Sequence, residues 1–330
     1  MNIRESVLKA IAASGEDFLS GGQLAENLGV SRTAVWKAIK ALEADGYLFD
    51  AVSGRGYRLS PRNNRLSAEL IRAELNSHED REIIVFDEID STNNYAKKLA
   101  SEGASHGTVI AADKQSAGRG RLGRSFFSPS GTGLYMSVII RPEISIEAAQ
   151  LITSCAACAA AEALEGLCGR QVDVKWVNDL YMNGKKICGI LTEASLSLET
   201  SSLDYAVIGI GMNVLSVRGI FSSELSEIAA SVEDEAGVKI SRNKLCAEIL
   251  GRLDERLEGI ENREFLEDYR RREILTGNII TASAGGERIT GRAVGIDDSA
   301  SLIVELEDGS RRALSSGEAN LCRIKNKSSV

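Results

Sequence analysis

The chain has 330 residues, enough for two or three domains of ordinary size. Hydrophobic residues make up 43% of it and charged residues 26%, with only 3 prolines, which excludes disordered, collagen-like and coiled-coil proteins. Lys and Arg total 39 against 47 Asp and Glu, a net charge of -8. The chain as a whole therefore lacks the positive charge of a general polyanion binder.

The first 60 residues have the pattern of a winged helix-turn-helix, which we predict for residues 1–62. Two short amphipathic segments, the first with Ile3, Val7, Leu8 and Ile11 on one face, are followed by the turn LGVS and by a third helix capped by Ser31. Two β-rich runs then surround SGRG, a hairpin with Arg55 at its tip. The candidate DNA contacts are the side chains on the polar face of the third helix and at the hairpin tip: Ser31, Arg32, Thr33, Trp36, Lys37, Lys40 and Arg55.

The charge of this segment differs from that of the rest of the chain. Residues 1–60 hold seven basic and seven acidic side chains, so the whole of the -8 belongs to residues 61–330. We therefore expect a neutral DNA reader, with weak nonspecific attraction to phosphates, joined to an acidic enzyme.

Residues 63–274 predict an α+β domain. Strand and helix patterns are mixed there without regular alternation, and Asn183-Gly184 marks a tight hairpin, which favours a largely antiparallel sheet. From Gly277 short alternating runs are separated by Gly-Gly and Asp-Gly turns. These predict a small β-barrel over residues 275–330.

The six cysteines are too sparse for a disulfide framework, and the pair in the Ala-rich helix predicts buried packing. Cys155 and Cys158 form a CxxC in an Ala-rich helix, no second CxxC follows, and the histidines are His78 and His106, too few for a zinc site. No apolar run approaches the roughly 18 residues of a membrane span. Arg4 interrupts the start, where a signal peptide would be apolar. We predict a cytoplasmic protein with no membrane partner.

A glycine-rich basic loop is the strongest chemical signal. The segment SAGRGRLGRSFFSPSGTG contains GxGxxG at Gly118, Gly120 and Gly123, but the residues after Gly123 do not open the helix that a dinucleotide site requires. Three arginines alternate with these glycines, an arrangement suited to anionic oxygens: Arg119, Arg121 and Arg124. The alternative is a solvated basic loop.

Further polar residues lie where elements begin or end. Residues 90–93, Asp-Ser-Thr-Asn, open a helix and either cap it or face a ligand. Lys175-Trp176-Val177-Asn178-Asp179 ends a strand, and Lys185-Lys186 begins the strand returning from the Asn-Gly turn. Through that hairpin, Lys186 can face the same pocket as Lys175.

Five segments in order, DSTN, QSAGRGRLGR, KWVNDL, GKKICGIL and GIGMN, resemble the bifunctional biotin protein ligase and biotin operon repressor family. The resemblance implies a class II synthetase-like ligase domain between a winged helix and an SH3-like barrel. It implies activation of biotin with ATP and Mg²⁺ to biotinyl-5′-AMP, and transfer of biotin to a lysine of the biotin carboxyl carrier protein. It also implies repression at operator DNA with the adenylate as corepressor. We expect a homodimer that forms through the central sheet.

The resemblance also assigns residues to roles. Catalysis is assigned to Arg121, Lys186 and Asp179. Biotin binding is assigned to Ser91, Thr92, Asn93, Gln115, Arg119, Gly120, Arg121 and Lys186. ATP and adenylate binding is assigned to Gly118, Arg119, Arg121, Arg124, Phe126, Lys175, Asn178 and Asn213. The sequence leaves open whether Asp179 or Asn178 orients the acceptor amine or a metal. Val177 and Phe126 replace a proline and a tryptophan common in relatives, and Phe221 is the candidate apolar plug over the adenylate.

Two other functions stay open at this stage. A repressor that only senses biotin would not need Arg119, Arg121 and Lys186 together, because the biotin rings are neutral. A lipoate ligase would share the general fold, but the winged helix and the GRGRLGR segment favour biotin by resemblance.

Overall fold

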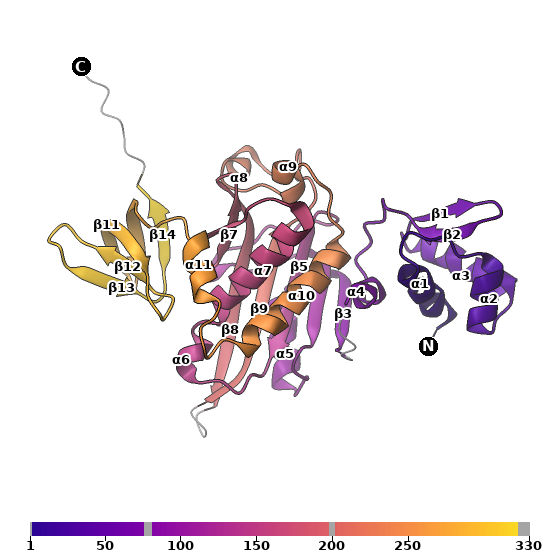
Figure 1. Cartoon of the computed structure of the whole chain (residues 1–330), viewed down its shortest axis with the longest axis horizontal. Helices are drawn as coiled ribbons and strands as arrows, with labels where there is room; N and C mark the ends of the chain where they lie inside the picture. Colours follow the sequence, from indigo (N-terminus) through magenta and orange to yellow (C-terminus); the bar gives the residue numbers. More distant parts are fainter. Residues whose placement is uncertain (1, 76–80, 198–201, 323–330) are drawn as a thin grey trace, which may run out of the picture.

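The computed structural model describes residues 2–75, 81–197 and 202–322. Three units follow one another along the long axis of the molecule: a helical unit with a small hairpin, a large central sheet covered by helices, and a second, smaller sheet (Figure 1). The predicted α+β class is confirmed. In the described residues no helix is long and apolar enough to span a membrane.

The N-terminal unit is a winged helix-turn-helix, as predicted. It consists of α1 (Ile3–Ala13), α2 (Gly21–Leu28), α3 (Arg32–Ala44), β1 (Phe49–Val52) and β2 (Gly56–Leu59). Ser31 caps α3 by accepting a hydrogen bond from the Ala34 N–H, and Gly29 ends α2 in the left-handed region. One detail differs from the predicted apolar face of α1. Ile3 is 43% exposed, because the buried part of that face begins one turn later, at Val7.

A short helix, α4 (Ala68–Glu74), joins this unit to the central domain. Its Leu70 packs in the core of the N-terminal unit, whereas the adjacent Ile71 packs in the core of the central domain. The helix therefore contributes a side chain to each of two hydrophobic cores. The segment that connects the two domains is packed against both of them.

The central sheet has seven strands among the described residues, in the order β3-β4-β5-β9-β8-β7-β6. In chain order these are β3 (Ile83–Ile89), β4 (Val109–Gln115), β5 (Gly133–Ile140), β6 (Asp173–Lys175), β7 (Asp179–Met182), β8 (Lys185–Ser197) and β9 (Ser202–Asn213). Within this described sheet only β3 and β4 run parallel. Asn183 and Gly184, both at positive φ, close the β7–β8 hairpin, as the Asn-Gly pair predicts.

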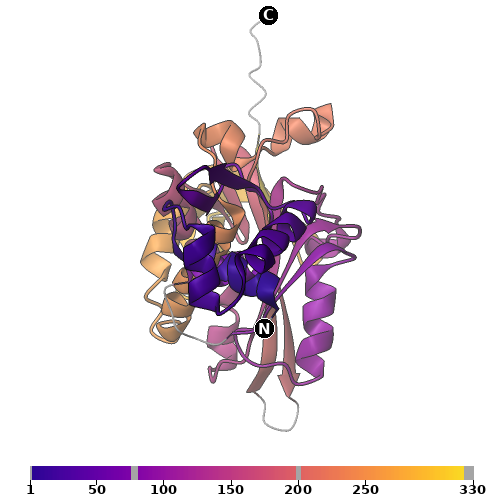
Figure 2. The ribbon, with the colours of Figure 1, turned by 90° about the vertical axis from the view of Figure 1, so that its right-hand side faces the viewer.

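Helices cover both faces of the sheet. Figure 2 shows α5 (Thr92–Ser101) and α10 (Arg242–Glu258) on opposite sides, and α7 (Ile152–Cys168) packs beside α10. The shorter helices are α6 (Ile146–Ala149), α8 (Ser223–Ile228), α9 (Val232–Ala236) and α11 (Leu266–Arg272). The predicted mixture of strands and helices therefore forms layers around one sheet.

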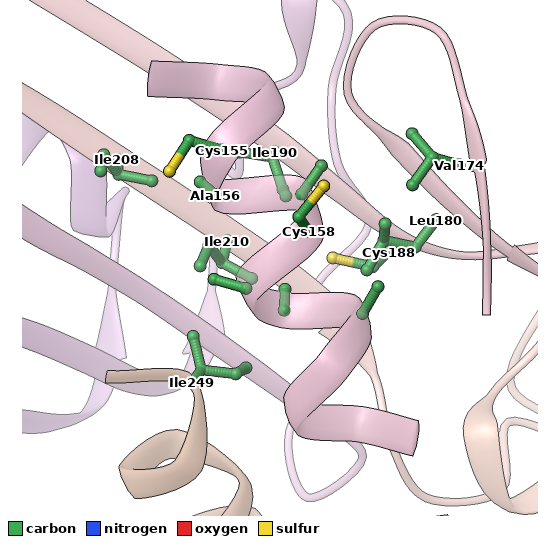
Figure 3. Close-up of a cluster of buried hydrophobic side chains, with 14 of the residues drawn as sticks. Cys155, Ala156, Cys158, Val174, Leu180, Cys188, Ile190, Ile208, Ile210 and Ile249 are labelled. Atoms are coloured by element: carbon green, nitrogen blue, oxygen red, sulfur yellow. The ribbon is translucent and has the colours of Figure 1, made fainter. Parts of the chain in front are cut away.

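Four of the six cysteines belong to this core, whereas Cys168 and Cys322 are only partly buried. Cys155, Cys158 and Cys188 lie among aliphatic side chains between α7 and the sheet (Figure 3). Burial raises the pKa of Cys155 to about 12, so its thiol stays protonated. The described residues contain no group of three potential metal ligands and no disulfide. The prediction that these cysteines pack as small apolar residues is confirmed.

The C-terminal unit, predicted as a small β-barrel, is an all-β domain with an antiparallel sheet of five strands in the described part of the chain. They are β10 (Ile279–Ala284), β11 (Glu287–Ile296), β12 (Leu302–Glu305), β13 (Arg311–Leu314) and β14 (Glu318–Leu321). Their order is β13-β12-β11-β10-β14, and no described pairing joins the two outer strands. The Trp176 indole Nε1 donates to the Ala300 carbonyl at 3.0 Å, which attaches this unit to the central domain.

Candidate active site and nucleic-acid interface

The polar segments of the central domain meet in one cavity that opens to solvent. It lies on the sheet face where α5 begins. Most of the side chains singled out from the sequence line it: Ser91, Thr92, Asn93, Gln115, Arg119, Gly120, Arg121, Arg124, Phe126, Lys175, Asn178, Asp179 and Lys186. Residues as far apart in the chain as Ser91 and Lys186 are therefore brought to a single site.

The glycine-rich loop runs along one wall of the cavity. Its backbone closes on itself, since Gly120 N donates to Arg124 O at 2.7 Å and Phe126 N donates to Gly118 O at 2.8 Å. The only helical turn within this described loop is a single 3-10 turn, Arg121–Gly123. The loop therefore lacks the helix that a dinucleotide fingerprint requires after its third glycine.

One end of the cavity is cationic. Arg121 donates to Asn178 Oδ1 at 3.0 Å, Lys186 Nζ lies 2.7 Å from Asp179 Oδ1, and Lys175 donates to Asn320 at 2.7 Å. Burial lowers the pKa of Arg121 and of Lys175, and the nearby Asp179 carboxylate opposes both shifts. The cations are thus held in place before any ligand arrives, which suits a site where negative charge gathers.

At the other end of the cavity, uncharged side chains are joined by hydrogen bonds. Gln115 Oε1 accepts from Thr92 N at 2.9 Å and from Thr92 Oγ1 at 3.2 Å, while its Nε2 donates to Ser128 Oγ at 3.0 Å. Ser91 caps α5 by accepting from the Asn94 N–H, which confirms the capping interpretation, and it also lines the cavity. Such fixed donors and acceptors suit a neutral polar ligand group.

Two glycines of β9 make room for these groups. A Cβ at Gly209 would lie 2.0 Å from Asn93 Oδ1, and a Cβ at Gly211 would lie 2.9 Å from the Phe126 ring. Any larger residue would push the amide or the ring aside. The alternation in the segment GIGMN therefore has a steric cause at the floor of the cavity.

The C-terminal unit completes the wall near the cations. Gly317, Glu318 and Ala319 line the cavity, and the Glu318 carboxylate accepts two hydrogen bonds from the Arg124 guanidinium, one at 3.0 Å and one at 2.5 Å. Sequence reasoning missed this contribution. The pair is separated by 194 positions, and no local pattern connects a barrel strand with the glycine-rich loop.

Four of the predicted residues are placed differently from the rest. Asn213 does not line the cavity, because its amide donates to the buried Ala230 carbonyl. Gly118 is covered as well, since a Cβ there would lie 2.4 Å from Phe126 O. Arg119 lines the cavity, but its guanidinium is bonded to Asn94 and to Glu193, a residue that the sequence did not suggest. Phe221 packs against Phe127, with ring centroids 5.9 Å apart.

All the candidate DNA contacts lie on the surface of the N-terminal unit. The exposed residues are Ser31, Arg32, Thr33, Trp36, Lys37, Lys40 and Arg55, and the indole-bearing Trp36 is 51% exposed. Lys40 is paired with Glu43 at 2.6 Å, and Arg55 lies over the Phe18 ring at 4.4 Å. The helix and the hairpin tip therefore present polar groups on the same unit, the arrangement of a reader that enters a groove with its third helix.

Comparison with known proteins covers each of the three units. Residues 85–213 match the Biotin/lipoate A/B protein ligase family, residues 4–58 match an HTH domain, and residues 276–321 match the Biotin protein ligase C terminal domain. The bifunctional ligase/repressor BirA of Bacillus spizizenii is 36% identical over 320 residues, which cover 95% of this chain and 97% of that protein. The chain belongs to the BirA family of bifunctional ligase/repressors.

Two more comparisons extend the BirA family resemblance. The bifunctional ligase/repressor BirA of Escherichia coli is also 36% identical, over 95% of this chain and 96% of its own. The biotin protein ligase of Aquifex aeolicus, solved in complex with biotin and ATP, has a TM-score of 0.62 at 30% identity. That structure covers 73% of this chain and 99% of its own. In this chain an HTH domain and a domain of the ligase family are thus joined.

Proposed function

We propose that this protein activates biotin with ATP to biotinyl-5′-AMP, transfers biotin to a lysine of the biotin carboxyl carrier protein, and represses transcription with the adenylate as corepressor. The observation that carries the proposal is the polarity of the cavity. Fixed uncharged donors and acceptors surround Thr92 and Gln115 at one end, and the cations Arg121, Lys175 and Lys186 stand at the other. Biotin has the same division, a neutral ureido ring and a carboxylate.

The first step joins two anions. An oxygen of the biotin carboxylate bonds to the α-phosphorus of ATP, the bond from that phosphorus to the bridging oxygen breaks, and pyrophosphate leaves. Cations held in place beforehand lower the repulsion and need no reorganisation during the reaction. Arg121 and Lys186 are the proposed catalytic residues, because each is already fixed by a partner at the cationic end of the cavity.

The cavity offers few carboxylates to a metal ion that enters with ATP. Among the described lining residues the carboxylates are Asp179 and Glu318, each paired with a cation, and no cluster of three potential ligands is present in that part of the chain. We infer that Mg²⁺ is carried by the ATP phosphates, with Asp179 as the protein ligand within reach. When bound there it supplies positive charge beside the phosphates.

In the second step an uncharged lysine amine of the carrier protein bonds to the biotinyl carbonyl carbon. The bond to the phosphate oxygen breaks, AMP leaves, and water takes the proton that the nitrogen loses. Of the two residues left open by the sequence, Asn178 is already held at both ends of its amide, since its Nδ2 donates to Ile190 O at 2.8 Å and its Oδ1 accepts from Arg121. Asp179 carries a carboxylate, which only accepts hydrogen bonds and so suits an amine donor. Asp179 is therefore the proposed residue that orients the amine.

Repression requires two DNA-binding units, because readers of this type bind paired half-sites as dimers. The outer edge of β8 supports a dimer through the central sheet. β7 pairs with β8 as far as Gly189, while β9 pairs with the other edge as far as Ser197. In the described chain the stretch beyond Ile190 has no strand on its outer side, and such an edge is a template for pairing with a second copy.

The test combines the purified protein with biotin, ATP, Mg²⁺ and a carrier domain. We expect covalent biotin on the carrier lysine, detected by mass spectrometry, and no labelling when ATP is omitted. Lipoate in place of biotin is the matched substrate control. Absence of labelled carrier at saturating biotin and ATP contradicts the ligase function, and labelling by lipoate alone assigns the other substrate of the family.

A further inference from the structure

Glu193 lies on β8 at the neutral end of the cavity, just outside its lining. Its carboxylate, with a side chain 23% exposed, accepts from Asn93 Nδ2 at 3.1 Å, from Lys97 Nζ at 2.8 Å and from Arg119 at 3.2 Å. Three donors from α5 and from the glycine-rich loop thus converge on one acid. No motif in the sequence singles it out.

The contacts of Asn93 use both of its N–H groups. Nδ2 donates one hydrogen bond to Glu193 Oε2 and another, of 3.2 Å, to the Leu191 carbonyl. On the other side of the amide, Oδ1 accepts from the fully buried Ser137 hydroxyl at 2.6 Å. Since an amide nitrogen has two hydrogens and an amide oxygen two lone pairs, the oxygen alone keeps capacity for a ligand.

We propose that Glu193 is a positioning residue that holds the Asn93 carboxamide with its oxygen toward the cavity, where it accepts an N–H of the biotin ureido ring. The inference rests on the proposed function. A carboxylate accepts hydrogen bonds and donates none, so a flipped Asn93 would place its oxygen against the Glu193 oxygens and lose both contacts. The acid thereby excludes one of the two amide orientations.

The charges around Glu193 keep it ionised for this role. Burial raises its pKa, but hydrogen bonds from Lys97 and Asn93 and the charges of Lys97 and Arg119 outweigh that effect and lower it. The same carboxylate binds the Arg119 guanidinium through both of its oxygens. The loop arginine that the sequence assigned to anions is bound to an anion of the protein itself.

The test is a double-mutant cycle on biotin binding, measured by titration calorimetry with the full-length protein and no ATP. Glu193→Gln has nearly the same shape but can donate a hydrogen bond, so both Asn93 orientations become allowed. We expect the Kd for biotin to rise about tenfold, the loss of one well-made hydrogen bond. In the Asn93→Ala background the same change should alter Kd by less than about twofold, because the group through which Glu193 acts is absent.

Two further variants separate positioning from folding. Lys97→Met removes a cation from Glu193 but leaves its contact with Asn93, and should keep the Kd within about twofold of the parent. Asp204 lies on β9, the strand next to β8, and is paired at the surface with Arg141 at 3.3 Å. Asp204→Asn makes the same carboxylate-to-amide change there and should also keep the Kd for biotin within about twofold of the parent.

The outcomes distinguish the inference from the proposed function. If the unmodified protein does not bind biotin, the proposed function fails. If it binds biotin and Glu193→Gln binds equally well, or weakens binding equally in both backgrounds, the role of Glu193 is overturned while the function stands. A tenfold loss in Lys97→Met also overturns it, because charge rather than amide orientation would then matter.

Discussion

The N-terminal unit and the central cavity hold their functional side chains in opposite ways. On α3 the polar side chains project from a helix whose other face, with Val35, Ala38, Ile39 and Leu42, is buried in a separate core. In the cavity nearly every polar group is bonded to another one, as Arg121 is to Asn178 and Thr92 is to Gln115. Side chains of the first kind act singly, whereas those of the second kind position one another.

Charge follows the same division. In the N-terminal unit Arg4, Lys40 and Arg58 are paired with carboxylates, while Arg32, Lys37 and Arg55 have no carboxylate partner among the described residues. Few cations per monomer are therefore available to phosphates. Because each phosphate contact adds a limited amount of affinity, a dimer is needed for tight binding.

The largest effect is expected at the cationic end of the cavity. Arg121→Ala and Lys186→Ala should each lower biotin-dependent pyrophosphate release by about a thousandfold, the scale measured when one fixed electrostatic group is removed. Circular dichroism should show an unchanged fold. Near-normal pyrophosphate release from either variant would remove that residue from the proposed catalytic pair.

The next largest effect is expected on the stability of the fold. It tests whether the hydrogen-bonded side chains of the central domain depend on one another. Arg242, nearly fully buried, donates to Asp113 at 2.7 Å, to Gly133 O at 2.9 Å and to Asn64 in the segment between the domains. Arg242→Met leaves these acceptors without their donor and should lower the free energy of unfolding by about 3–5 kcal/mol. Urea denaturation measures this loss.

Arg311→Met is the matched control for that measurement. Arg311 is paired with Glu305 at 3.0 Å, but its side chain is 66% exposed. The exposed pair should contribute less than about 1 kcal/mol. Equal losses in the two variants would contradict the idea that the polar network of the central domain is the more interdependent one.

A smaller effect is expected on DNA binding. Lys37→Ala and Arg55→Ala should weaken operator binding about threefold to tenfold each and reduce the dependence of log Kd on log salt by about one unit, as the loss of a phosphate contact does. Ligation should not change, because these side chains lie on another unit. Gel shifts at matched salt measure the effect, and unchanged shifts would place the DNA contacts elsewhere.

The smallest effect is expected at Lys40. Its ammonium is engaged by Glu43 one turn along α3, and this pairing raises the pKa of Lys40. Lys40→Ala should therefore change operator affinity by less than about twofold, since a cation already paired on its own helix has less charge to offer a phosphate. A loss as large as that of Lys37→Ala would show that the pair opens on DNA.

Local sequence patterns were enough to predict the three units, the helix caps and the β7–β8 hairpin, because each of these features depends on only a few neighbouring residues. The 3.6-residue helical period placed Val35 on the buried face of α3 and Trp36 on its exposed face, and the Asn183-Gly184 pair specified the β7–β8 turn. The clustering of arginines in one glycine-rich loop likewise indicated a site for anions, since their charge and spacing can be read from the amino-acid sequence.

The partners of the polar groups, in contrast, follow from the tertiary structure alone. Glu193 meets Asn93 across 100 positions of the chain and Glu318 meets Arg124 across 194. The sequence assigned Asn213 and Arg119 to the ligand site, but in the fold their side chains donate to Ala230 and Glu193. Such partners are set by sheet register and by the docking of one unit on another, and a hydrogen bond forms only where both place donor and acceptor about 3 Å apart.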